Sequence, residues 1–180
     1  MVSTVTTNGA TNALPTGPDL TLAEAREIID RAVSKAGEYL QNGAFAVVDA
    51  AGNVVSISKM DDAPAVAPRV ARAKAVLAAI MQGPTNTFAE RMDQHPVRYA
   101  AYLDMLPDKT FPGGGGAPIM RGKRCVGGLA TGPGVAPLTS IPGVHPTQLT
   151  SGNASGNAED LVICYALRVP YRSQHGAGVH

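Results

Sequence analysis

The chain has 180 residues, of which 44% are hydrophobic and only 4% aromatic, and its formal net charge is +1. This length suits one domain with a hydrophobic core. The near-neutral charge offers no basic surface of the kind that binds nucleic acid. No stretch approaches the ~20 apolar residues of a membrane span. Alanine and valine dominate the apolar residues, which predicts a core of small side chains that often needs subunit association to bury enough area.

The two ends of the chain have the composition of flexible segments. Residues 1–18 contain neither a basic region nor an apolar stretch, so we expect no signal peptide and take the cytoplasm as the compartment. Residues 171–180 predict a flexible tail, which leaves 19–170 as a single domain. Cys125 and Cys164 each lie in an apolar stretch, so reduced, buried thiols are expected rather than a disulfide.

The first half of the chain alternates helical and extended patterns. Thr21 and Glu24 form a capping box, after which apolar residues recur at helical spacing for about four turns. A continuous apolar strand, a turn rich in Asp, Gly and Asn, and a returning strand then predict a hairpin. These patterns place, in chain order, a helix from Thr21, a hairpin over 44–58, a turn at 60–64 and a helix from Pro68 to the break at Gly83 and Pro84.

The second half begins with short helical patterns and ends with a long irregular stretch. Thr87 and Glu90 form a second capping box. Residues 131–156 are rich in Gly, Pro, Ser and Thr and show no periodicity, which predicts a functional insert or an arm that reaches a neighbouring subunit. The expected elements are helices over 87–92 and 96–104, a hairpin over 117–130, and a last helix capped by Asn157.

Four consecutive glycines, Gly113, Gly114, Gly115 and Gly116, precede the second hairpin. Such a run loses much backbone freedom on folding, and it is tolerated where φ must be positive or where something approaches the backbone closely. Since neither a Walker nor a dinucleotide-binding pattern is present, the run predicts a ligand-facing loop. The alternative interpretation is a surface loop between a helix and a hairpin.

Taken together, these stretches resemble the GlcG/HbpS-like heme-binding family, which also contains the C-terminal domain of PduO-type proteins. The order and spacing of the motifs carry the resemblance, since no single one is diagnostic. The matching segments are 20–26, 46–55, 59–64, 71–75, 84–85, 112–114, 117–119 and 122–128, together with the last helix from Ala158.

The resemblance implies an α/β (α+β) fold with a central antiparallel β-sheet flanked by helices. It also implies a homo-oligomer, from a dimer to an octamer, that holds heme or a related small ligand near subunit contacts. The chain departs from the family pattern in its insert over 131–156, in its C-terminal tail, and at Asp62, where the family has glycine.

The predicted ligand site lies between the glycine run and the helix that carries Lys74, with Thr85 at its edge. Lys74 lies in an otherwise apolar stripe, so it must reach out to solvent, pair with a carboxylate or meet an anionic ligand. The Thr85 hydroxyl caps the next segment or points into the pocket. The glycine amides are anion-seeking donors, and together these groups favour an anionic ligand.

Other candidate residues lie outside this group. Met60, Asp61 and Asp62 form a turn that either binds a ligand or cation or is simply solvated. Arg69 could hold a carboxylate of the ligand or stay exposed on its helix. His145, in the insert, is the metal candidate, although its surroundings in the sequence favour a surface role.

Three functional interpretations follow from these residues. The first is a protein that binds heme or a related small ligand. The second is an enzyme of proton-transfer, hydration or isomerisation type acting on a small anionic metabolite, because Lys74, the acidic pair Asp61 and Asp62, and the glycine amides suit such chemistry. The third is a purely structural or regulatory oligomer. No nucleophile elbow is present, and spacing assembles no catalytic triad.

Overall fold

The computed structural model describes residues 20–38, 42–106, 108–133 and 154–169. Its centre is a four-stranded sheet of order β2-β1-β4-β3, in which every neighbouring pair is antiparallel. The two predicted hairpins are present, and they join along β1 and β4. The predicted fold, an antiparallel sheet flanked by helices, is confirmed. The strands are β1 (Ala44–Asp49), β2 (Val54–Lys59), β3 (Gly116–Arg121) and β4 (Arg124–Gly132).

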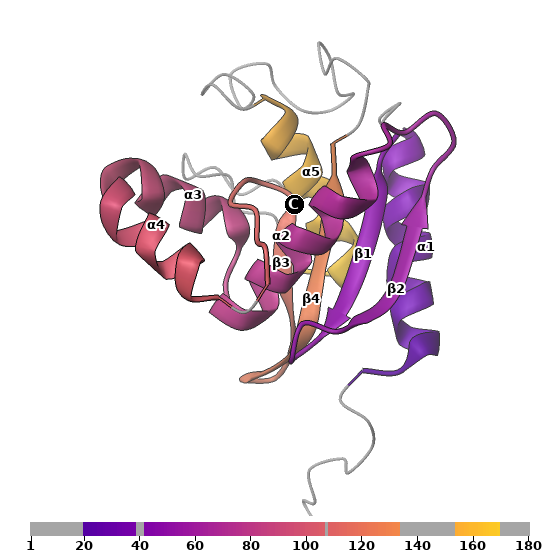
Figure 1. Cartoon of the computed structure of the whole chain (residues 1–180). Coiled ribbons are helices and arrows are strands. Elements are labelled where there is room, and N and C mark those ends of the chain that lie inside the picture. Colours follow the sequence, from indigo (N-terminus) through magenta and orange to yellow (C-terminus); the bar gives the residue numbers. More distant parts are fainter. Residues whose placement is uncertain (1–19, 39–41, 107, 134–153, 170–180) are drawn as a thin grey trace, which may run out of the picture.

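Helices cover both faces of this sheet (Figure 1). α1 (Leu22–Glu38) and α5 (Ala154–Leu167) pack on one face, and α2 (Ala67–Met81) packs on the other. The capping box of α1 forms as predicted, because the Thr21 amide donates to the Glu24 carboxylate at 2.8 Å and the Glu24 amide donates to the Thr21 hydroxyl at 3.2 Å.

α2 lies closer to the sheet than ordinary side chains would allow. Its inner face carries Ala67, Ala71 and Ala75 at four-residue spacing, all fully buried. Opposite them β4 has glycines, and a Cβ at Gly128 would overlap the carbonyl oxygen of Ala75. A Cβ at Gly132 would likewise overlap the carbonyl oxygen of Ala67. The abundance of alanine and glycine therefore sets the separation of helix and sheet.

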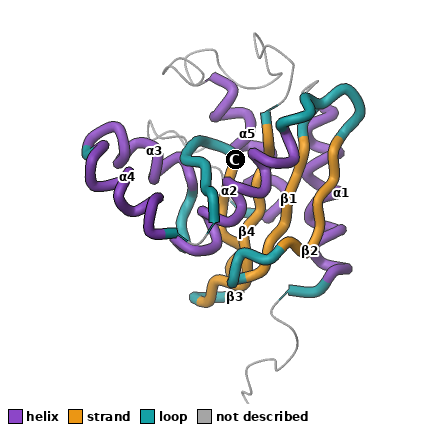
Figure 2. The backbone as a smooth tube through the Cα atoms, in the orientation of Figure 1, coloured by secondary structure: helices purple, strands orange, loops and turns teal. Residues whose placement is uncertain are grey.

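α3 (Thr85–Gln94) and α4 (Pro96–Met105) form a helical pair beside α2, at one side of the molecule (Figures 1 and 2). The rings of Phe88 and Tyr99 pack edge to face across the pair, with centroids 4.9 Å apart. The prediction that Thr87 caps α3 is wrong. α3 begins at Thr85, directly after Pro84, and the Thr87 amide instead donates to the Asn86 side chain at 2.6 Å.

The last helix also begins earlier than predicted. α5 starts at Ala154, so Asn157 lies inside its first turn and does not cap it. Helix propensity does not explain this earlier start, since Ser155 and Gly156 are poor helix formers. Since β4 continues to Gly132, both ends of the predicted 131–156 insert belong to regular elements. Residues 134–153 of the insert lie outside the described residues, as do the predicted arm over 1–18 and the tail over 171–180.

Cys125 and Cys164 are free thiols, and both are half-buried, so they are less buried than the sequence predicts. None of the described helices is long and apolar enough to cross a membrane.

The contact between α2 and β4 can be tested by substituting Gly128. We expect Gly128→Ala to lower the free energy of unfolding by about 3 kcal/mol or more, because two backbones must separate to admit the methyl group. Gly37→Ala is the matched control, since no atom lies within 4 Å of the added Cβ and alanine is the better helix former. Urea denaturation measures both, and equal stabilities for the two variants would contradict this account of the packing.

Candidate functional site

The predicted glycine run, Gly113–Gly116, forms a loop that is buried from Gly114 onward, enters β3 at Gly116 and packs against α5; we call it the glycine loop. Gly115 has φ +87°, in the region that side chains rarely adopt. Its amide donates to the Asp160 carboxylate at 2.6 Å. A Cβ at this position would lie 2.7 Å from the Cβ of Glu159. The close approach that the glycine run predicts is therefore made by two carboxylates of the protein's own last helix.

A buried ion pair joins α2 to α5 beneath this loop. Lys74 Nζ lies 2.7 Å from Glu159 Oε2, and the two side chains are only 5% and 10% exposed. Lys74 Nζ also lies 6.0 Å from the centre of the Phe111 ring, at the outer limit of a cation–π contact. Of the alternatives for Lys74, the structure shows the ion pair. Because both charges have left water, each depends on the other.

Asp160, the next residue of α5, is held by two donors. Besides the Gly115 amide, the Asn86 side chain donates to it at 3.1 Å. Burial nevertheless raises the pKa of the Asp160 carboxyl to about 6, since it outweighs the Gly115 hydrogen bond, and the charge of Glu159 raises this pKa further. Burial also raises the pKa of Glu159, against the opposing charge of Lys74. Asp160 is thus a carboxyl that can exchange a proton near neutral pH.

Thr85 ties the start of α3 to the glycine loop. Its side chain is buried, and its hydroxyl lies within hydrogen-bond distance of the carbonyl oxygens of Gly113 and Gly116, the latter at 3.3 Å. The hydroxyl donates to the loop and makes no side-chain cap of α3. Of the two interpretations of Thr85, the structure rules out the side-chain cap of α3, and binding of a ligand by Thr85 stays a prediction.

The structure brings together Lys74, Thr85 and the glycine loop, as the sequence predicted for the ligand site. It does not bring the other candidates to them. Asp61 and Asp62 are exposed in the turn after β2, next to half-buried Met60. Arg69 is exposed on α2. His145 lies outside the described residues, and binding by all these residues stays a prediction.

Sequence reasoning missed the roles of Glu159, Asp160 and Asn86. Two adjacent carboxylates directly before the apolar residues 161–164 were a usable signal, because acidic side chains at the start of a buried helical segment need partners. The prediction of a helix cap at Asn157 used Asp160 as a capping residue instead. No pattern in the sequence distinguishes Asn86.

A cavity of about 310 Å³ lies on the outer side of Asp160. Its walls are mostly apolar, and Asn86, Asp160 and Cys164 supply the polar side chains. Burial and the nearby Asp160 charge raise the pKa of the Cys164 thiol to about 11, so this thiol is neutral at physiological pH. Within the described residues, no three His, Cys, Asp or Glu side chains gather closely enough to hold a metal ion. The cavity is lined by Pro84, Asn86, Gly116, Ala117, Pro118, Asp160, Ile163, Cys164, Leu167 and Val169.

A family model described as "Haem degrading protein HbpS-like" matches residues 20–135, which is more than half of the chain. The chain belongs to the HbpS-like family. The match covers the sheet, α1 to α4 and the glycine loop, and ends before α5, which supplies Glu159 and Asp160. No curated protein sequence matches the chain.

Solved structures share the fold of this HbpS-like chain. A double mutant of HbpS from Streptomyces reticuli is 23% identical, with a TM-score of 0.65 over 93% of this chain and 97% of that one. PduOC in complex with heme is 20% identical, with a TM-score of 0.64 over 83% of this chain and 93% of that one. Klebsiella pneumoniae protein ORFY is 21% identical, with a TM-score of 0.63 over 83% and 88%. At these identities the likeness shows the fold alone.

The buried ion pair predicts strong coupling between α2 and α5. We expect Lys74→Met to lower the free energy of unfolding by about 3–5 kcal/mol, because Glu159 then stays buried without a counter-charge. The double variant Lys74→Met with Glu159→Leu should recover much of this loss. Arg72→Met is the control, since the Arg72–Asp108 pair on the same helix is more than a third exposed and should contribute no more than about 1 kcal/mol. If the double variant loses as much unfolding free energy as the two single variants together, the coupling between α2 and α5 is contradicted.

The raised pKa of Asp160 predicts a pH-dependent stability. A carboxyl with a pKa of about 6 in the folded state, against an ordinary 3.8, binds its proton more tightly when folded. Its contribution to stability is therefore present below about pH 4 and is lost as the pH rises through about 6, by up to about 3 kcal/mol. We expect the stability of the parent to fall relative to Asp160→Asn over this range. A difference that stays constant with pH, measured by chemical denaturation, would refute the assignment.

Proposed function

We propose that the protein binds heme or a related small ligand in the cavity beside the glycine loop, at a contact between subunits of a homo-oligomer. The cavity carries this proposal, because an apolar hollow with a few convergent polar groups is the usual form of a small-molecule site. Membership of the HbpS-like family supports heme as the ligand. The PduOC structure, which was solved as a complex with heme, adds to this support.

The lining of the cavity fits the body of a tetrapyrrole. Ile163, Leu167 and Val169 offer apolar contacts to the ring, and the Asn86 amide can donate to a carboxylate. The cavity's Cys164 is of a type that ligates iron, but its raised pKa keeps it protonated. When bound, heme would supply the redox and oxygen chemistry of its iron. The residues of this chain would hold its edge and limit access of water.

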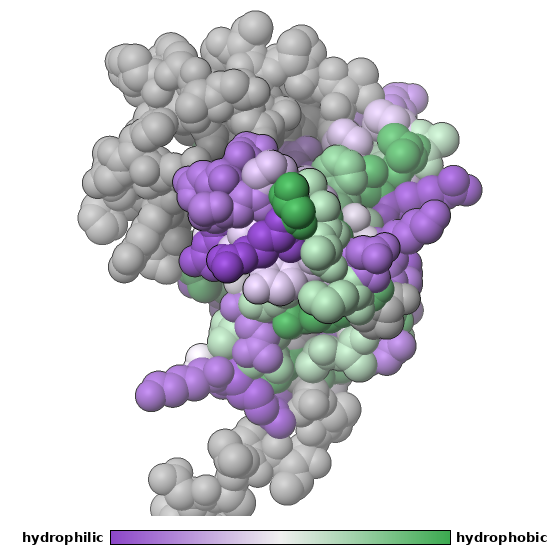
Figure 3. Space-filling model, turned by 60° about the vertical axis from the view of Figure 1, so that its left-hand side comes forward, coloured by the Kyte–Doolittle hydropathy of each residue, from purple (hydrophilic) through white to green (hydrophobic). Residues whose placement is uncertain are grey.

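Exposed apolar side chains support the proposed assembly. In the described structure α4 buries none of its residues, and Val97 is 85% and Met105 70% exposed. On the side turned forward in Figure 3, a band of hydrophobic residues lies between strongly hydrophilic groups. A heme is larger than a hollow of about 310 Å³, so a second subunit would complete the site. We propose a dimer or a larger assembly, up to an octamer.

Hemin titration tests the proposed site. We expect a Soret shift that saturates near one hemin per subunit, on a protein whose mass by light scattering is a multiple of 18.5 kDa. Ala117→Glu should weaken binding at least tenfold, because it places a charge in an apolar wall of the cavity. Ala50→Glu, in the exposed turn after β1, is the matched control. Equal binding by both variants would place the site elsewhere, and a monomer would rule out the subunit contact.

A second candidate function rests on Asp160. A carboxyl whose pKa is about 6 and that lines a cavity is suited to general acid–base catalysis. The enzyme interpretation would be proton transfer, hydration or isomerisation of a small anionic metabolite. Unchanged spectra with hemin, together with thermal stabilisation by a dicarboxylate such as succinate that is lost in Asp160→Asn, would favour this function over heme binding.

A further inference from the structure

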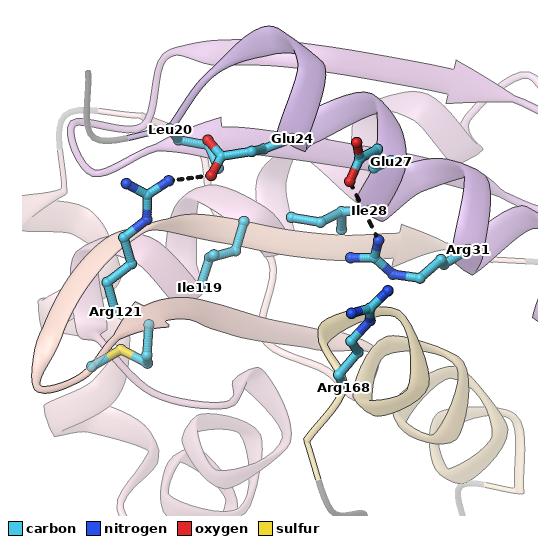
Figure 4. Close-up of a pocket in the computed structure, with 9 residues that line it drawn as sticks. Leu20, Glu24, Glu27, Ile28, Arg31, Ile119, Arg121 and Arg168 are labelled. Carbon is cyan, nitrogen blue, oxygen red and sulfur yellow. Dashed lines mark hydrogen bonds and ion pairs between the residues drawn. The ribbon is translucent and has the colours of Figure 1, made fainter. Parts of the chain in front are cut away.

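We propose that a second pocket, between α1, β3 and the end of α5, binds a small amphipathic carboxylate. The pocket has a volume of about 260 Å³ and shares no lining residue with the cavity beside the glycine loop. Three arginines from three separate elements line it, as Figure 4 shows: Arg31 of α1, Arg121 of β3, and Arg168 just after α5.

The charges of this pocket are incompletely balanced. Two glutamates line it beside the three arginines, so one positive charge is in excess. Arg121 pairs with Glu24. Arg31 NH1 lies 3.9 Å from Glu27, at the limit of an ion pair. Within the described chain, no residue gives the Arg168 side chain a hydrogen bond or an ion pair. The excess charge therefore resides on Arg168.

The placement of Arg168 concentrates positive potential at one point. In Figure 4 its guanidinium points at that of Arg31, with no carboxylate drawn between them. Arg31 is fixed, because its Nε donates to the Ala166 carbonyl at 2.9 Å. Two like charges that face each other repel, and an anion placed between them would relieve the repulsion. Because a guanidinium fork matches the two oxygens of a carboxylate, this anion is best a carboxylate.

The backbone holds Arg168 in this position. The residue has φ +56°, a left-handed conformation that usually selects glycine or asparagine after a helix. Its amide donates to the Tyr165 carbonyl at 3.0 Å, and the Val169 amide donates to the Cys164 carbonyl at 3.0 Å. A long charged side chain therefore stands at the C-terminal end of α5, where glycine is the usual residue.

The floor of the pocket is apolar, which makes the expected ligand amphipathic. Leu20, Ile28 and Ile119 belong to the buried core on this side of the sheet. Met120, 44% exposed, adds a flexible thioether at the side. A ligand with a carboxylate at one end and a short apolar or aromatic group at the other would satisfy both halves of the site.

Binding of phenylbutyrate, followed by calorimetry and by shifts of arginine side-chain NMR signals, tests this site in the full chain. We expect saturable binding that weakens as salt rises, and at least tenfold weaker binding of the neutral amide, phenylbutyramide. Arg168→Gln should weaken phenylbutyrate binding at least tenfold and leave the thermal midpoint unchanged, because the side chain has no partner to lose within the described chain. Arg98→Gln on exposed α4, which removes the same charge outside the pocket, should bind as the parent does.

Three results would overturn the proposal: no binding by the parent at millimolar phenylbutyrate, equal binding of the amide, or equal binding by Arg168→Gln. Met120→Gln adds an independent measurement, since a polar wall should weaken phenylbutyrate while leaving the arginines in place. The outcome is separate from the hemin titration, because the two pockets have different walls.

Discussion

The buried ion pair between Lys74 and Glu159 is the interaction on which the rest of the site depends. It fixes the depth at which α5 packs, and therefore the position of Asp160 against the Gly115 amide. An isolated charge of either sign would be very costly in this interior, so the two helices form the site together or not at all. The glycine loop passes directly over the pair, where any side chain at Gly115 would displace Glu159.

The second constraint is the small volume of the residues between layers. α2 and β4 contact each other through the backbone atoms of alanine and glycine residues. This close packing brings the ammonium group of Lys74 within reach of Glu159 on α5, which packs on the other face of the sheet. Close packing of small residues makes the layers rigid but leaves little apolar area per residue. In the described structure, α4 leaves apolar side chains such as Val97 and Met105 exposed.

The two pockets described above both adjoin α5, and they differ in character. The first combines apolar walls with a carboxyl that titrates near neutral pH, and so suits a large apolar ligand or proton transfer. The second combines an apolar floor with an excess of guanidinium, and so suits an anion. α5 lines the first pocket from Asp160 to Leu167, and Arg168, the residue directly after α5, lines the second. This helix lies outside the segment that the family model matches.

Local patterns in the sequence were enough to predict both hairpins and the capping box at Thr21, because periodicity, turn chemistry and capping act over a few residues. The fold class rested on the family resemblance, which the order of motifs along the chain carries. The sequence also predicted that Lys74, Thr85 and the glycine run lie together. The same patterns misplaced the starts of α3 and α5, because a capping pattern marks a possible helix start and does not exclude an earlier one. Only the folded structure shows that Glu159 pairs with Lys74 and that Asp160 accepts a hydrogen bond from the Gly115 amide. Those pairings join residues far apart in the sequence, and burial, not spacing, selects them.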